Sequence, residues 1–403
     1  MRVSQFAGPA LRDSPDRPYQ RSMLKTLPII ERVREWTFEK ALPFWTENAA
    51  DRRYGGFVEE LTIDGKDAGS PEKRTRVACR QIYAFSHASM LGAGDGAHHI
   101  AAGVDYLATK AWQGADKGFA RRLARDGAVA DPTPDLYDNA FALFAFAWAY
   151  RATRESSYLR WAHKTLDFIE KKMAQGEGFA HWLPMTGHRL QNPHMHLLEA
   201  ALAAYEASGE ARFGELAFSL AALFSRRFFD AKTGTLGEYF EGDWRRADGD
   251  KGRIVEPGHQ FEWTWILDNC GRLLGLDLAA DMRALAGFAE RNGVDPKSRA
   301  VYMAVAGDGE VLDGSSRVWA NTERLKAAVA LHERERRDPA RVFNESAGLL
   351  LDRYFAPTAS HPIPEGTWID AFDPEGRPLS KTIPASSLYH VLLAFAEVMR
   401  VGG

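Results

Sequence analysis

Residues that could perform acid–base chemistry lie at the starts of several amphipathic segments. In VEPGHQFEWTWIL, residues 255–267, His259 and Glu262 stand three positions apart and therefore share one face of a helix. His390 follows SSLY near the end of the chain, and Arg80 lies in RVACRQIYAF. Histidine titrates near neutral pH and can accept and return a proton, whereas arginine can hold an oxygen that becomes negatively charged. This set predicts proton transfer at a carbon next to a sugar carbonyl.

The elements that must position these groups are helices. Apolar residues recur at three- and four-residue spacing, which is typical of a helix with one buried face. The pattern predicts helices at 22–48, 76–91, 97–112, 135–153, 156–174, 192–208, 211–229, 260–275, 278–292, 319–335, 338–355 and 386–400.

These helices recur with a regular period. The second helix of each pair starts at an interval of about 57 to 68 residues, which indicates an array of helical hairpins. Six hairpins that close on themselves form an all-α (α/α)6 barrel with an inner and an outer ring. Strand-like stretches at 55–61, 117–123, 177–183 and 234–240 predict short β-hairpins in the loops. An open solenoid is disfavoured, because the repeats diverge and the loops are long.

The second helices form the inner ring of such a barrel, and their first turns then face one cavity. That arrangement brings together Arg80, Tyr137, Asp138, Asn192, His194, His196, His259, Glu262, Trp319, Glu323 and His390. Several of these residues also have ordinary structural explanations. Asp138 can cap its helix, Arg80 can pair with a buried acid, and Trp319 can be a core aromatic residue.

Metal and nucleotide cofactors are not predicted. His194 and His196 are two residues apart and point in nearly opposite directions on a helix, so they are poor joint ligands. The pair His259 and Glu262 has no HExxH or cysteine-rich pattern beside it, and glycine motifs that cradle phosphates are absent. We expect Glu262 instead to orient or charge His259.

Composition indicates a globular protein of the cytoplasm. The formal charge of −3 gives no basic field for nucleic acid, and no apolar run reaches the length of a membrane span. The two cysteines, Cys79 and Cys270, lie in apolar helical patterns and predict buried thiols in a reducing compartment. We expect residues 1–20 to be a flexible extension and residues 21–403 to form one domain, as a monomer or homodimer.

Four segments together resemble the N-acylglucosamine 2-epimerase superfamily. They are NPHMHLLEA at 192–200, GHQFEWTWIL at 258–267, RVWANTERLKA at 317–327 and SLYH at 387–390. The resemblance covers about residues 25–400 and implies an (α/α)6 barrel with the site at one end. The WANTERLKA and SSLYH pattern is most similar to the branch that contains D-mannose isomerases.

The resemblance also implies roles for individual residues. His259 and His390 match the family's acid–base histidines, Glu262 matches its helix-borne glutamate, and Arg80 matches its substrate-holding arginine. Further positions expected to contact a monosaccharide are Tyr137, Asn192, His196, Trp319 and Glu323, while His194 has no assigned role.

The activity implied is the interconversion of D-mannose and D-fructose through a cis-enediol. A sugar 2-epimerase, acting on N-acylglucosamine or a related monosaccharide, would use the same residues. Three further alternatives remain open: a metal-dependent isomerase, a glycosidase that uses Asp138 and Glu323, and a sugar-binding protein without catalysis.

Overall fold

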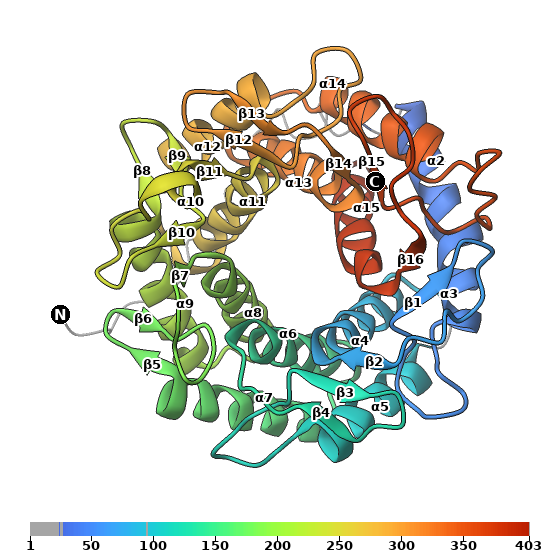
Figure 1. The fold of residues 1–403 in the computed structure, drawn as a ribbon, viewed down its shortest axis with the longest axis vertical. Coiled ribbons are helices and arrows are strands. Elements are labelled where there is room, and N and C mark those ends of the chain that lie inside the picture. The colour runs from blue at the N-terminus through green and yellow to red at the C-terminus, as the bar shows by residue number, and fades with distance from the viewer. Residues whose placement is uncertain (1–23, 25–26, 94–95, 403) are drawn as a thin grey trace.

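Six helices form the inner ring of the molecule. The computed structural model describes residue 24 and residues 27–93 and 96–402. The inner helices are α4 (Thr75–Met90), α6 (Leu136–Thr153), α8 (Asn192–Ser208), α11 (Pro257–Leu274), α13 (Val318–Glu335) and α15 (Leu388–Gly402). Each packs against the next, and α15 packs against α4, so the ring is closed (Figure 1).

An outer ring of helices surrounds the inner one. Its members are α2 (Pro28–Glu35), α3 (Leu42–Asn48), α5 (Ala97–Tyr106), α7 (Ser156–Phe168), α9 (Ala211–Leu223), α12 (Ala279–Asn292) and α14 (Ala340–Val342). Short π-helical turns continue or join several of them: Trp36–Ala41, Leu107–Ala111, Ile169–Met173, Phe224–Phe228, Phe343–Ala347 and Leu350–Tyr354. The hydrophobic core fills the space between the two rings.

Small antiparallel sheets lie at the end where the inner helices begin (Figure 1). Two have three strands: β2 (Glu72–Arg74), β3 (Arg122–Ala124) and β4 (Val129–Asp131), and β11 (Ile254–Val255), β12 (Ala304–Ala306) and β13 (Val311–Asp313). The two-stranded pairs are β1 (Glu60–Thr62) with β16 (Thr382–Pro384), β5 (Ala174–Gln175) with β6 (Gly178–Phe179), β7 (Arg189–Leu190) with β10 (Tyr239–Phe240), β8 (Phe229–Asp230) with β9 (Thr235–Leu236), and β14 (Ser316–Arg317) with β15 (Ala371–Phe372).

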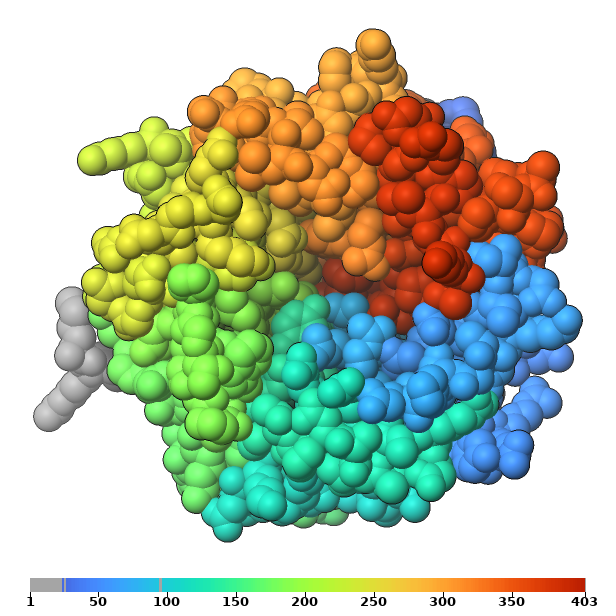
Figure 2. All heavy atoms as spheres, in the orientation of Figure 1, coloured from blue at the N-terminus to red at the C-terminus, as the bar shows by residue number. Residues whose placement is uncertain are grey.

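The sheets fix the starts of the inner helices. Strands β2, β7, β11, β14 and β16 each come directly before, or within a few residues of, an inner helix. The pair β1 and β16 places Leu61 opposite Ile383 and thereby joins the first hairpin to the last. A short helix, α10 (Gly249–Arg253), precedes β11. The face that carries these sheets is hollowed near its centre (Figure 2).

Sequence explains where the inner helices begin and end. The Asp135 side chain accepts hydrogen bonds from the backbone N–H groups of Tyr137 and Asp138 and so caps α6. Gly209 and Gly275 follow α8 and α11 with positive φ angles, a conformation that glycine adopts without strain. Because α6 is enclosed by its neighbours, alanine and aromatic residues bury nearly its whole circumference.

The predicted fold class, an all-α (α/α)6 barrel with short β-hairpins, is confirmed. Two predicted helices are interrupted: within 22–48 a π-helical turn separates α2 from α3, and 338–355 is divided into α14 and two π-helical turns. Cys79 and Cys270 are buried and unpaired, as expected. Within the described residues, none of the helices is long and apolar enough to cross a membrane. The predicted extension at 1–20 lies outside the described residues, and the domain boundary stays a prediction.

Candidate active site

The two predicted histidines lie in the first turns of their helices and face the same tryptophan. The ring of Trp319, from α13, has its centroid 5.1 Å from that of His259 on α11 and 5.9 Å from that of His390 on α15. Both histidine side chains are buried. The barrel therefore brings together residues that are more than one hundred positions apart in sequence, as the alignment of helix starts predicted.

His259 is held by carboxylates from two loops. Its Nδ1 lies 2.9 Å from Oε2 of Glu238 and 3.4 Å from a carboxylate oxygen of Glu256. Gln191 donates to the same Glu238 oxygen at 2.8 Å and accepts a hydrogen bond from Trp263 Nε1 at 2.7 Å. Burial by itself lowers the pKa of His259, but Glu238 and Glu256 outweigh it and raise the pKa to about 10. His259 is therefore an imidazolium at neutral pH.

Glu262 contributes to the charge of His259, as expected, because its carboxylate helps to raise the pKa of that histidine, but it does not orient the ring. The carboxylate in hydrogen-bond contact with His259 is Glu238, from the loop before β10. Glu262 lies one turn further along α11, and one oxygen of Glu262 falls within 4.8 Å of atoms of Glu323 and His390. Its Oε1 is buried without a hydrogen-bond partner among the described residues. Glu262 thus belongs to the surroundings of His390.

His390 has the opposite electrostatic environment. Its Nδ1 lies 2.8 Å from Oε1 of Glu323, whose other oxygen is 2.6 Å from Nζ of Lys326. Burial, together with the positive charges of Arg80 and Lys326, lowers the pKa of His390 well below its usual range. Burial and the neighbouring Glu262 raise the pKa of the Glu323 carboxyl, against the influence of Lys326. His390 is therefore a neutral imidazole.

Aromatic rings enclose the predicted substrate-holding arginine. The Arg80 guanidinium lies 4.4 Å from the centre of the Phe141 ring and 5.0 Å from that of Tyr389. Its Nη2 donates to the hydroxyl of Tyr137 at 2.7 Å, and its Nε is buried without a partner in the described part of the chain. By contrast, the carboxylate of Asp138 pairs with Arg76 at 2.8 Å. Asp138 is thus engaged in an ion pair.

The helix α8 supplies three of the predicted positions, with different surroundings. His196 contacts the Tyr137 ring at 4.8 Å, and its Nδ1 is 3.1 Å from Glu199. Asn192 has a buried Oδ1 without a partner within the described ranges. His194 points the other way: it accepts from the Phe179 N–H and bonds the Leu190 carbonyl, and burial lowers its pKa to about 4. His194 is structural.

Several residues of the site were not predicted from the sequence. Glu199 accepts hydrogen bonds from the Tyr389 hydroxyl at 2.6 Å, and Lys326 is fully buried beside Glu323. The i,i+3 spacing of Glu323 and Lys326, which places them on one helix face, could have indicated this pair. No such spacing relates Glu238 to His259, because the two residues belong to different hairpins.

Histidine and carboxylate groups at metal-ligand distances occur three times among the described residues. Two share Glu262: one joins it to His196 and Glu199, and the other to Glu323 and His390. The third is His259 with Glu238 and Glu256. A protonated His259 donates its Nδ1 hydrogen to Glu238 and cannot ligate through that atom, and the Lys326 ammonium already supplies a cation to Glu323. The clusters around His259 and around Glu323 therefore suit proton transfer better than metal binding.

Fold and site together define an (α/α)6-barrel protein with a titratable site at the amino ends of its inner helices. The chain belongs to the N-acylglucosamine 2-epimerase family, whose model matches residues 55–394. As the sequence predicted, it is an enzyme of the isomerase and epimerase class.

Its relatives carry related names. A "Mannose-6-phosphate isomerase" of Rhizobium meliloti (strain 1021) is 35% identical over 373 residues, which cover 90% of this chain and 95% of the relative. A "D-mannose isomerase" of Thermobifida fusca is 29% identical over 313 residues, or 71% and 75% of the two chains. A solved D-mannose isomerase structure matches with a TM-score of 0.80 at 20% identity, covering 94% of this chain and 97% of that one. A cellobiose 2-epimerase from Bacillus thermoamylovorans B4167 matches with a TM-score of 0.83 at 18% identity, covering 92% and 98%.

Proposed function

We propose that the protein interconverts D-mannose and D-fructose by proton transfer through a cis-enediol. The observation that carries this proposal is that two histidines packed against the same Trp319 ring have opposite electrostatic surroundings. Glu238 and Glu256 raise the pKa of His259 to about 10, whereas burial and the charge of Arg80 lower the pKa of His390 well below its usual range. Two titratable groups whose environments push their pKa values apart can serve as the acid and the base of one reaction.

His390 is the base in this mechanism. A neutral His390 that donates its Nδ1 hydrogen to Glu323 keeps the lone pair of Nε2 for the substrate. It removes the proton from C2 of open-chain mannose, and the electron pair of that bond enters the enediol. Return of a proton from His390 to C1 completes the ketose.

His259 stabilises the oxygens while the proton moves between carbons. Its imidazolium can donate a hydrogen bond to the carbonyl oxygen as negative charge develops there, and can shuttle a proton between O1 and O2. Arg80, whose guanidinium has no carboxylate partner among the described residues, supports the same oxyanion. Both cations contribute most when the charge is largest, in the transition state.

The remaining site residues bind the sugar in this proposal. Trp319 offers a ring face to the apolar side of the pyranose, and the unpartnered Oδ1 of Asn192 and Oε1 of Glu262 are acceptors for hydroxyl groups. The other side chains of the proposed sugar site are those of Tyr137, His196 and Glu323.

A 2-epimerase is the second candidate, because the family model and the cellobiose 2-epimerase relatives point to it. An epimerase would return the proton to the opposite face of C2. NMR of the products from mannose, lyxose, N-acetylmannosamine, cellobiose and mannose 6-phosphate separates the candidates. Fructose from mannose supports the proposal, whereas glucose from mannose, or glucosyl-mannose from cellobiose, supports the epimerase. Failure to convert all five sugars would overturn both.

A cytoplasmic location and a monomeric or homodimeric state stay predictions. We propose that the protein acts without a cofactor, since proton transfer by His259 and His390 requires none. Size-exclusion chromatography with light scattering measures the oligomeric state.

A further inference from the structure

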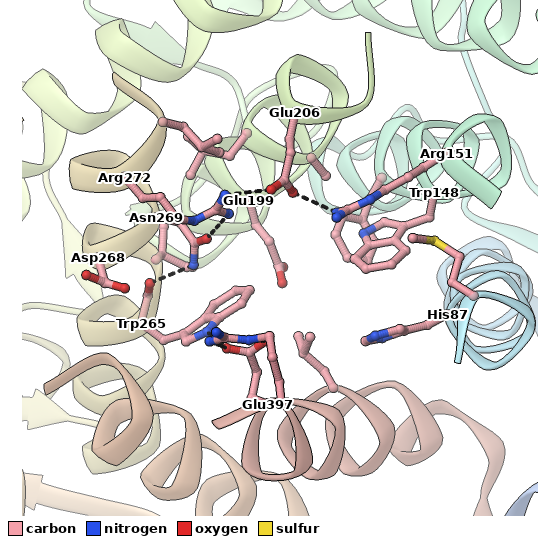
Figure 3. Close-up of a pocket in the computed structure, with 18 of the residues that line it drawn as sticks. His87, Trp148, Arg151, Glu199, Glu206, Trp265, Asp268, Asn269, Arg272 and Glu397 are labelled. Atoms are coloured by element: carbon pink, nitrogen blue, oxygen red, sulfur yellow. Dashed lines mark hydrogen bonds and ion pairs between the residues drawn. The ribbon is translucent and has the colours of Figure 1, made fainter. Parts of the chain in front are cut away.

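A second cavity opens at the opposite end of the barrel, between the carboxyl-terminal halves of the inner helices. This back cavity has a volume of about 340 Å³ and is lined by His87, Trp148, Arg151, Glu199, Trp265 and Glu397, among others (Figure 3). All six inner helices contribute to it. The proposed substrate site lies at the other end of the same helices, so the two spaces share a common barrier.

The charged groups around the opening neutralise one another. Glu206 pairs with Arg151 and with Arg272, in both cases at 2.6 Å. Arg400 pairs with Glu333 at 2.7 Å, and all of these side chains are partly exposed. A space of this size that is open to solvent and edged by charged side chains has room for water.

Glu199 is the residue that the back cavity shares with the proposed active site. Its carboxyl points into the middle of the lining side chains (Figure 3), although the residue is only 4% exposed. The same carboxyl accepts the Tyr389 hydroxyl at 2.6 Å and lies 3.1 Å from Nδ1 of His196. One titratable group therefore touches both the cavity and the histidine on α8.

From Glu199 a continuous set of titratable groups leads to His390. An oxygen of Glu262 lies within 4.8 Å of atoms of both His196 and Glu199, and Glu262 also lies within 4.8 Å of Glu323 and His390. Lys326 stands beside this set: its Nζ is 2.6 Å from Glu323 and 4.4 Å from the centre of the Trp265 ring, which lines the back cavity. The side chains that separate the back cavity from the proposed substrate site are therefore polar along the path from Glu199 to His390.

We propose that Glu199 exchanges protons between water in the back cavity and the base His390, by way of Glu262. This inference rests on the proposed function, in which a bound sugar covers the front of the site. In this proposal, the back cavity is the route by which protons are exchanged with solvent while the sugar is bound. Glu199 is accordingly a proton-exchange residue that does not touch the substrate.

The proton balance is simple. The C2–H bond breaks, its proton goes to His390, and its electron pair goes to the enediol. During the lifetime of the enediol, His390 passes that proton to the Glu262 carboxyl, from which it leaves through Glu199 to water. A proton from water takes the reverse path, and His390 delivers it to C1. No oxidant or further reactant takes part.

The test is the isotope content of fructose made from ordinary mannose in D2O. Early in the reaction, NMR gives the fraction of C1 positions that retain the original proton and the fraction that carry deuterium. Wild-type product should contain deuterium at C1. Glu199→Gln should raise the retained-proton fraction severalfold, because the amide cannot relay protons. Ala203→Leu, one turn along α8 and in the cavity wall, should do the same with Glu199 intact.

Glu206→Gln is the matched control, since it neutralises an acid of the same helix and the same cavity outside the relay. Its retained fraction should equal that of the wild type. An equal fraction in Ala203→Leu and wild type, or no deuterium at C1 in wild-type product, overturns the inference while the proposed isomerase activity stands. Absence of fructose from the wild type overturns the proposed function itself.

Discussion

Replacement of Glu238 by glutamine tests the charge state of His259. Glutamine keeps the size of the side chain and removes the negative charge 2.9 Å from Nδ1 of His259. Glu238 is the strongest of the groups that raise the pKa of this histidine, and it also accepts its hydrogen bond. The substitution therefore acts on the imidazolium without touching the substrate pocket directly.

The magnitude follows from the pKa of His259. A rise from 6.5 to about 10 corresponds to about 5 kcal/mol in favour of the imidazolium, at 1.36 kcal/mol per pKa unit. Loss of one close carboxylate lowers a pKa by roughly 1 to 3 units, so the Glu238→Gln protein should titrate between roughly 7 and 9. At pH 9 the wild type keeps its imidazolium, and the variant loses much of it.

The assay is kcat/KM for mannose as a function of pH. The alkaline limb of the profile should lie near pH 10 in the wild type and move down by roughly 1 to 3 units in Glu238→Gln. Glu256→Gln is the control, because that carboxylate is 3.4 Å away and one-quarter exposed, and it should shift the limb less. An alkaline limb that stays in place in Glu238→Gln would refute the assignment of His259 as the cation.

The ion pair between His259 and Glu238 also makes the stability of the folded protein depend on pH. The folded-state pKa of His259 lies above its ordinary value, so the stabilisation is fully present below pH 6.5 and disappears as the pH rises through about 10. Urea unfolding should therefore show a stability loss for Glu238→Gln that is largest near neutral pH and shrinks above pH 10. A constant difference across this range would contradict the linkage.

Three further outcomes are expected. His390→Asn should lower kcat by ~10² to 10⁴-fold with an unchanged circular dichroism spectrum, and a rate equal to that of the wild type would contradict its role as base. Lys326→Met should lower the free energy of unfolding by about 3 to 5 kcal/mol in urea titrations, because it leaves the buried Glu323 without its cation. Lys40→Met removes an exposed ion pair and should change the free energy of unfolding far less. Dialysis against EDTA should leave kcat unchanged, and recovery of a lost activity on addition of a divalent metal would favour a metal-dependent isomerase.

The fold could be predicted because its signal is repeated. Each hairpin buries the face of one helix against its neighbours, so every repeat carries the same apolar spacing, and the six starts give the period. The segment 338–355 has the apolar spacing of a helix, but two π-helical turns interrupt it. An apolar pattern does not distinguish such turns from an α-helix.

The site could be predicted only along the inner helices. His259, Trp319 and His390 each occupy the first turn of a helix, and a closed ring brings such turns together. The spacing predicts Glu262 as the group that orients His259, but an i,i+3 pair shares a face and differs in depth by about one turn, roughly 5 Å, so Glu262 acts on His259 only through its charge. Glu262 therefore lies deeper in the barrel, beside His390, whereas Glu238 reaches His259 from another hairpin.

Conversion of D-mannose by the wild-type protein and by His390→Asn, followed by NMR in parallel, tests the central claim most directly. A neutral His390 acting as base predicts that the wild type forms fructose and that the variant forms it at a rate lower by ~10² to 10⁴-fold. Fructose formation at equal rates by both proteins, or glucose in place of fructose from the wild type, would contradict it.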